Sequence, residues 1–149
     1  AGDALQDVAP ALKEDLEIVL AAVRQDGRSV QYAAGPLKGE REVVLEAVKQ
    51  QGLALEYVSE ECTEDREVVL AAVKHDGLAL EFAAEELQAD REVVLVAVRQ
   101  NWEALQFAAE PLKVLPKVVL AAVQQNVRAL QCVHLDSLSA CKEDAQLMA

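Results

Sequence analysis

The chain has 149 residues, of which 52% are hydrophobic and only 3% aromatic, so we expect one domain with an aliphatic core. Its formal net charge is −12 with only 14 Lys and Arg, which argues against a nucleic-acid or anionic-membrane partner and favours a protein. No apolar run approaches the roughly 20 residues that a spanning helix needs, so we expect a soluble protein without direct membrane insertion.

A period of 25 residues runs through almost the whole chain. Two of its columns are Leu20, Leu45, Leu70, Leu95 and Leu120, and Val23, Val48, Val73, Val98 and Val123. A short fixed period predicts a stack of similar units, here an all-α solenoid. We expect a single repeat domain over residues 1–134, with a half repeat at 1–14 and repeats at 15–39, 40–64, 65–89, 90–114 and 115–134.

The first half of each repeat predicts a helix, most clearly in residues 65–73 and 90–98, which differ at one position. Asp65 suits an N-cap, and Glu67 places negative charge near the positive end of the helix dipole. Val69, Leu70 and Val73 recur at helical spacing and predict the buried face.

A break follows, with glycine at three of its five copies. Gly27, Gly52 and Gly77 suit a left-handed residue at the end of a helix. Trp102 and Val127 stand at the same position, so that conformation is not obligatory there.

The second half of each repeat, such as residues 53–60, predicts another helix, with Ala54 and Leu55 facing inward and Cys62 closing its end. Alternation of apolar residues in this segment would also fit the strand of a leucine-rich repeat. We favour the helix, because Ala and Glu are poor strand formers. The prediction is therefore helix-turn-helix: five helix pairs, followed by a tail or capping helix over residues 135–149.

Residues 65–87 (DREVVLAAVKHDGLALEFAAEEL) resemble the signature of a family of tandem short helical repeats, described only as a domain of unknown function. The resemblance extends from about Leu5 to Val133 and is most specific over residues 40–110. Residues 111–134 depart from it. The family is found often in unicellular algae and in some intracellular bacteria. It implies the helical fold and no catalytic residue or cofactor.

No catalytic, cofactor or metal site is expected from the residues themselves. His75 takes a position that is glutamine in the other repeats, and His134 lies in a different repeat without ligands at metal-site spacing. The three cysteines are odd in number and favour a reducing compartment, although a bridge between Cys132 and Cys141 is the alternative.

Positions that break the repeat are the best candidates for partner contacts. They are Trp102, Val114, Leu115 and Val127, where other repeats carry glycine or polar residues. A second candidate is the ladder of one basic residue and one Gln or His per repeat, such as Lys74 and His75. Its simpler interpretation is the solvated end of a helix.

These features predict a non-enzymatic protein–protein interaction or scaffolding module, or an architectural subunit of a larger complex, for which an organelle is one candidate location. The start at Ala1 would suit a processed chain or a fragment. The alternative is a substrate-adaptor or regulatory repeat region of a longer multidomain enzyme or effector. A receptor for a small apolar molecule is the least favoured hypothesis.

Overall fold

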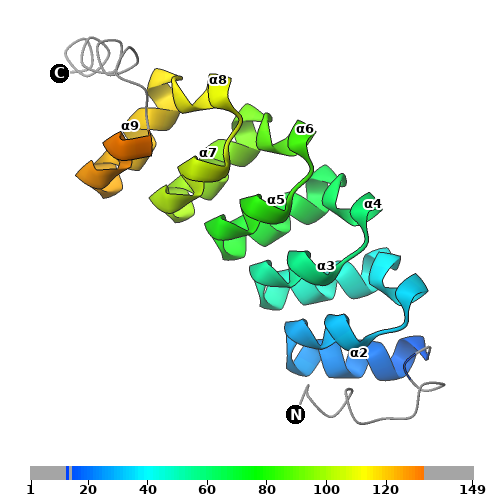
Figure 1. The fold of residues 1–149 in the computed structure, drawn as a ribbon. Coiled ribbons are helices and arrows are strands. Elements are labelled where there is room, and N and C mark those ends of the chain that lie inside the picture. The colour runs from blue at the N-terminus through cyan, green and yellow to red at the C-terminus, as the bar shows by residue number, and fades with distance from the viewer. Residues whose placement is uncertain (1–12, 14, 133–149) are drawn as a thin grey trace.

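The computed structural model describes residue 13 and residues 15–132, of which the last two by their backbone alone. Every element in this part of the chain is helical, and the elements stack into an elongated, curved solenoid (Figure 1). The predicted all-α solenoid is confirmed. Nearly all of the half repeat at 1–14, the tail at 135–149 and His134 lie outside the described residues. No helix of the described part is both long and apolar enough to cross a membrane.

Each repeat begins with an α-helix of ten residues. These long helices are α2 (Leu16–Gln25), α3 (Arg41–Gln50), α5 (Arg66–His75), α7 (Arg91–Gln100) and α9 (Pro116–Gln125). The predicted N-cap is confirmed at Asp65, whose carboxylate accepts from the backbone N–H groups of Glu67 and Val68 at 2.9 and 3.3 Å. Asp15 and Asp90 cap α2 and α7 in the same way.

The buried side of the long helices is shifted slightly from the predicted one. In α5 the fully buried side chains are Val68, Val69, Ala72 and Val73, whereas Leu70 is only half-buried. The other leucines of that column, Leu45, Leu95 and Leu120, are also half-buried, and only Leu20 is buried. The leucine column therefore lies at the boundary between core and surface.

The second half of each repeat is a 3₁₀ helix of six residues and not the predicted α-helix. These helices are η2 (Gly27–Tyr32), η4 (Gly52–Tyr57), η5 (Gly77–Phe82), η6 (Trp102–Phe107) and η7 (Val127–Cys132). Ala54 and Leu55 are buried as predicted, and Glu56 is exposed. A 3₁₀ helix rises about 2.0 Å per residue, so six residues cover about 12 Å of the roughly 15 Å of a ten-residue α-helix. Because the 3₁₀ helix rises further per residue, six residues are enough to cover most of the long helix of the same repeat.

A third, shorter element completes the repeat and was not predicted separately. It is η3 (Gly35–Gly39) in the first repeat and then α4 (Glu60–Thr63), α6 (Glu85–Gln88) and α8 (Glu110–Lys113). These elements line one edge of the stack (Figure 1). The N–H of Ser59 donates to the carbonyl of Lys38 at 3.0 Å, and Ala84 donates likewise to Thr63. The edge is therefore tied from repeat to repeat by backbone hydrogen bonds.

The repeated glycines are explained by close approach and not by a left-handed backbone. No described residue has a positive φ. A Cβ placed on Gly27 would lie 2.5 Å from the carbonyl oxygen of Ala47, in the long helix of the next repeat. On Gly52 and Gly77 it would lie closer still to the equivalent carbonyls of Ala72 and Ala97. Glycine thus lets consecutive repeats pack backbone against backbone.

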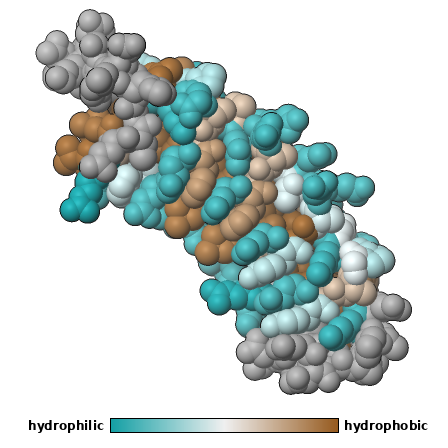
Figure 2. Space-filling view, in the orientation of Figure 1, coloured by the Kyte–Doolittle hydropathy of each residue, from teal (hydrophilic) through white to brown (hydrophobic). Residues whose placement is uncertain are grey.

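The core between these layers consists almost entirely of Val, Ala and Leu, as the composition predicted. Its largest fully buried side chains include Leu55, Leu80 and Leu105, one from each 3₁₀ helix of the middle repeats. Hydrophobic side chains also reach the surface, most densely toward the C-terminal repeats (Figure 2). Because each layer buries its side chains against its neighbours, the short helices are stabilised by stacking.

Candidate functional site

The four predicted partner-binding residues fall in two separate places at opposite ends of α9. Val114 and Leu115 precede its first residue, whereas Val127 follows its last turn and Trp102 stands one repeat earlier in the same column as Val127. Ten helical residues separate the two places by about 15 Å. The structure therefore does not gather these residues into one site.

Trp102 and Val127 differ in exposure although they share the glycine position. Trp102 is half-buried and packs against the core, and its backbone N–H donates to the side-chain oxygen of Gln125 at 2.9 Å. Val127 is 69% exposed. Trp102 thus joins the packing between two repeats, and Val127 is the more accessible of the pair.

Val114 and Leu115 differ in the same manner. Val114 is exposed, while Leu115 is half-buried against the core and is the N-cap residue of α9 without a side-chain cap. Val114 and Val127 are thus the two exposed members of the predicted set.

The Asp-Arg-Glu signature forms a ladder of ion pairs between repeats. Arg41 contacts Asp65 at 3.2 Å and also Glu67, and Arg66 contacts Asp90 at 2.9 Å and also Glu92. Each aspartate therefore caps its own helix and pairs with the arginine of the repeat before it. The ladder stops at the fifth repeat, where Leu115 and Lys117 replace the acids.

This ladder lowers the pKa of both capping aspartates. The hydrogen bond from Arg66 lowers the pKa of Asp90 and, with the N–H groups of Val93 and Glu92, outweighs the opposing effect of partial burial. For Asp65, partial burial is the largest single effect and raises the pKa, but the bonds from Arg41 and from two backbone N–H groups lower it overall. Both carboxylates are therefore stabilised in their charged form.

The Gln and His column, predicted as one half of a candidate surface, holds neighbouring repeats together. Gln100 accepts from the N–H of Gly77 at 2.5 Å and donates to the carbonyl of His75 at 3.3 Å. His75 itself accepts from the N–H of Gly52 at its Nδ1, at 3.1 Å. These side chains satisfy backbone groups at the helix junctions of the preceding repeat, so their amide and imidazole groups are engaged.

The exposed side of the long helices, which we term the long-helix face, carries three parallel rows of side chains. They are an acidic row (Glu17, Glu42, Glu67 and Glu92), a leucine row (Leu20, Leu45, Leu70, Leu95 and Leu120) and a basic row (Arg24, Lys49, Lys74 and Arg99). Spacings of three and four residues place one member of each row on the same side of a helix.

A groove of about 520 Å³ lies on this face between α3 and α5. Its lining consists of Lys49, Glu67, Leu70, Ala71, Lys74 and His75. The groove thus joins the leucine row to the basic row over two consecutive repeats.

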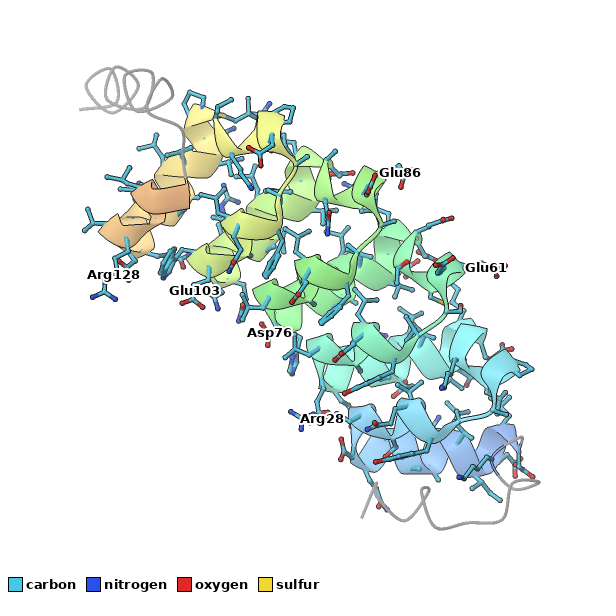
Figure 3. The ribbon with its side chains drawn as sticks, in the orientation of Figure 1. Arg28, Glu61, Asp76, Glu86, Glu103 and Arg128 are labelled. Carbon is cyan, nitrogen blue, oxygen red and sulfur yellow. The ribbon has the colours of Figure 1, made fainter. Side chains whose placement is uncertain are left out.

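The two edges of the stack carry different charge patterns (Figure 3). Glu61 and Glu86 project from the edge of short helices, whereas Arg28, Asp76, Glu103 and Arg128 lie along the opposite edge, which therefore carries charges of both signs. A second hollow, of about 290 Å³, lies on the short-helix edge and is lined by four glutamates with Thr63 and Ala84. The basic row lies in the last turns of the long helices, next to the edge that carries Arg28 and Asp76.

The model of the family described as "Domain of unknown function (DUF4116)" matches residues 15–63 and 65–113. The chain belongs to this family. Each match spans two of the 25-residue repeats, so the DUF4116 unit corresponds to a pair of repeats. No curated protein and no solved structure matches the chain. The fifth repeat, which departs from the signature, lies beyond the matched residues.

Within this DUF4116 array, most of the regular sequence signal belongs to contacts between repeats. Glycine, glutamine and the Asp-Arg-Glu triplet each bond or pack against the neighbouring unit. The sequence alone indicates local helix geometry for the first and last of these, because a single repeat does not show what lies 25 residues away. The basic row is visible in the sequence, but only the structure separates it from the glutamine column.

Proposed function

We propose that this DUF4116 protein is a non-enzymatic repeat module that binds or scaffolds other proteins through its long-helix face. The observation that carries the proposal is that one set of side chains joins the repeats and another set lines the long-helix face. Side chains such as Gln100 and Arg66 bond to the neighbouring repeat, whereas the basic row and the half-buried Leu45, Leu70 and Leu95 repeat along the surface. A stacked array of this kind offers an extended surface whose length grows with the number of repeats.

The apolar component of this surface supports a protein partner. Leu45, Leu70 and Leu95 are half-buried and sit at the boundary of the core, beside Ala71 and Val96, which are also half-buried. Covering such side chains stabilises a complex by about 25 cal/mol per Å² of apolar surface removed from water. An architectural subunit of a larger complex would use the same face permanently.

The proposal is tested by photo-crosslinking in an extract of the source organism. A photoreactive amino acid is placed at Leu70 in the groove, and a matched one at Glu61 on the short-helix edge. We expect discrete adducts from Leu70 that an excess of unlabelled protein competes away. Adducts that form equally from both positions, or that resist competition, would contradict the use of this face.

A further inference from the structure

We propose that the basic row and the leucine row together bind an acidic segment of a partner protein in polyproline II conformation, with a carboxylate at every third residue. This inference rests on the proposed interaction function and specifies the chemistry of the partner. It depends on three features of the long-helix face: unpaired cations, a groove between them, and their spacing.

The cations of the basic row have no described side-chain partner, whereas Arg41 and Arg66 near the helix N-termini do. Arg41 and Arg66 are held by the Asp and Glu side chains of the following repeat. Among the described residues, no ion pair or hydrogen bond involves the side chain of any member of the basic row, which consists of Arg24, Lys49, Lys74 and Arg99. Each of these repeats thus contributes one unpaired cation to the row.

The acidic row of the same face is largely neutralised in the middle of the array. Glu67 and Glu92 pair with Arg41 and Arg66 of the preceding repeats. Glu42 has no such partner, because Leu16 stands at the arginine position. In the third and fourth repeats the acidic row is thus paired, whereas the side chains of Lys74 and Arg99 have no described ion pair.

A groove places the cations beside apolar surface. Lys49 and Lys74 belong to different repeats, yet both line the groove of about 520 Å³ together with Leu70 and Ala71. A ligand lying in it would place apolar side chains on Leu70 while its carboxylates reach the two ammonium groups. Contact between opposite charges beside a partly dry surface is stronger than in open water.

The spacing of the basic row fits a ligand in polyproline II conformation. Packed helices lie about 8–10 Å apart, so consecutive cations are expected at about that interval. A polyproline II segment has three residues per turn and a rise of about 3.1 Å, so every third side chain lies on the same side at intervals of about 9.3 Å. In a β-strand, residues three apart point to opposite faces, so a strand could not present acids at this interval.

The test uses the purified 149-residue chain and a fluorescent peptide of four Glu-Pro-Leu triplets. Fluorescence anisotropy is compared with a peptide of the same composition whose glutamates are clustered at one end, and with a Lys-Pro-Leu peptide. We expect the periodic acidic peptide to bind most tightly and its affinity to fall as salt is raised. Equal binding of the periodic and clustered peptides, or no binding, would overturn the proposal.

Paired charge-reversal variants locate the binding. Lys49→Glu with Lys74→Glu should weaken binding of the periodic peptide at least about tenfold, which corresponds to about 1.4 kcal/mol. Arg28→Glu with Arg128→Glu makes the same change in net charge at residues that do not line the groove, and should change the affinity by less than about twofold. Equal losses in both variants would indicate unspecific attraction and refute the site.

The outcome separates this inference from the proposed function. If the periodic peptide fails to bind while the crosslinks from Leu70 persist, the partner chemistry is wrong and the interaction face stands. If the crosslinks are absent but the peptide binds at Lys49 and Lys74, the groove recognises acidic segments and the assignment of a scaffolding partner fails. Circular dichroism of each variant confirms that the helices are retained.

Discussion

The backbone N–H of Gly52 donates a hydrogen bond of 3.1 Å to Nδ1 of His75, which lies in the next repeat. In the following repeat Gln100 makes two such hydrogen bonds, because its amide both accepts from the N–H of Gly77 and donates to the carbonyl of His75. An imidazole that accepts at Nδ1 has no donor on the same atom. The His75 junction therefore has one side-chain hydrogen bond where its neighbour has two.

His75→Gln should consequently stabilise the protein. The new amide can retain the bond from Gly52 and add one to the carbonyl of Gln50, which is equivalent to that of His75 one repeat later. We expect the free energy of unfolding in urea to rise by about 0.5–1.5 kcal/mol, the usual net value of one added hydrogen bond. The reciprocal change, Gln100→His, should lower it by a similar amount. A fall in stability for His75→Gln would show that the imidazole has contacts that glutamine cannot replace.

Gly52→Ala should destabilise the stack, because its Cβ would collide with the carbonyl oxygen of Ala72. Since that oxygen belongs to the backbone of a buried helix, the two repeats must move apart. We expect a loss of about 1–3 kcal/mol in the free energy of unfolding, as for other overpacked sites.

Gly35→Ala is the matched control, because a Cβ there meets no atom within 4 Å. Glu110, which stands at the same repeat position, also precedes a proline, so a side chain is accommodated there. We expect the stability of this variant to remain within about 0.5 kcal/mol of the original. Equal losses at Gly35 and Gly52 would show that close approach is not what makes glycine necessary at Gly52.

The glycines also show how far sequence analysis reaches in a repeat protein. The period follows from comparing repeats, and the N-caps at Asp65 and Asp90 and the burial of Ala54 and Leu55 follow from patterns within one repeat. The 3₁₀ geometry of the second helix does not, because the α and 3₁₀ helices bury similar positions over six residues. The glycine requirement depends on a carbonyl 20 residues away, in the next long helix.

The candidate residues were predictable to a smaller extent. Breaks in the repeat selected Val114 and Val127, which are exposed, but they equally selected Trp102 and Leu115, which pack against the core. A departure from a pattern shows that the environment has changed and does not show whether the new side chain faces solvent. Only the packing of neighbouring layers separates the two cases.

Asp90→Asn should lower the free energy of unfolding at neutral pH and make it depend less on pH in acid. Asparagine still caps α7, but it loses the charge of the pair with Arg66, and we expect a cost of about 0.5–1 kcal/mol. The pKa of Asp90 is lowered in the folded state, so its contribution is complete above the unfolded pKa of about 3.9 and is lost as the pH falls through the lower folded value. Urea unfolding at several pH values should show the difference between variant and original narrowing below about pH 4.

The control for this variant is Asp76→Asn, which alters a cap of the same chemistry without an arginine partner. Asp76 accepts from the N–H of Leu78 at 3.0 Å, and no described ion pair involves it. We expect a smaller loss at neutral pH than for Asp90→Asn. If the two variants lose equally, the ladder of ion pairs contributes nothing beyond the caps.

Ser29→Ala should stabilise the first repeat, because the Ser29 hydroxyl is buried without a hydrogen-bond partner among the described residues. The equivalent positions carry Ala54, Ala79 and Ala104, all fully buried, so the alanine methyl group fits this layer. Removing an unsatisfied buried hydroxyl should raise the free energy of unfolding by about 1 kcal/mol. The reverse change, Ala54→Ser, introduces the same hydroxyl one repeat later and should lower it by a similar amount. If Ser29→Ala instead lowers the free energy of unfolding in urea, the hydroxyl must be hydrogen-bonded in solution, and that bond offsets its desolvation.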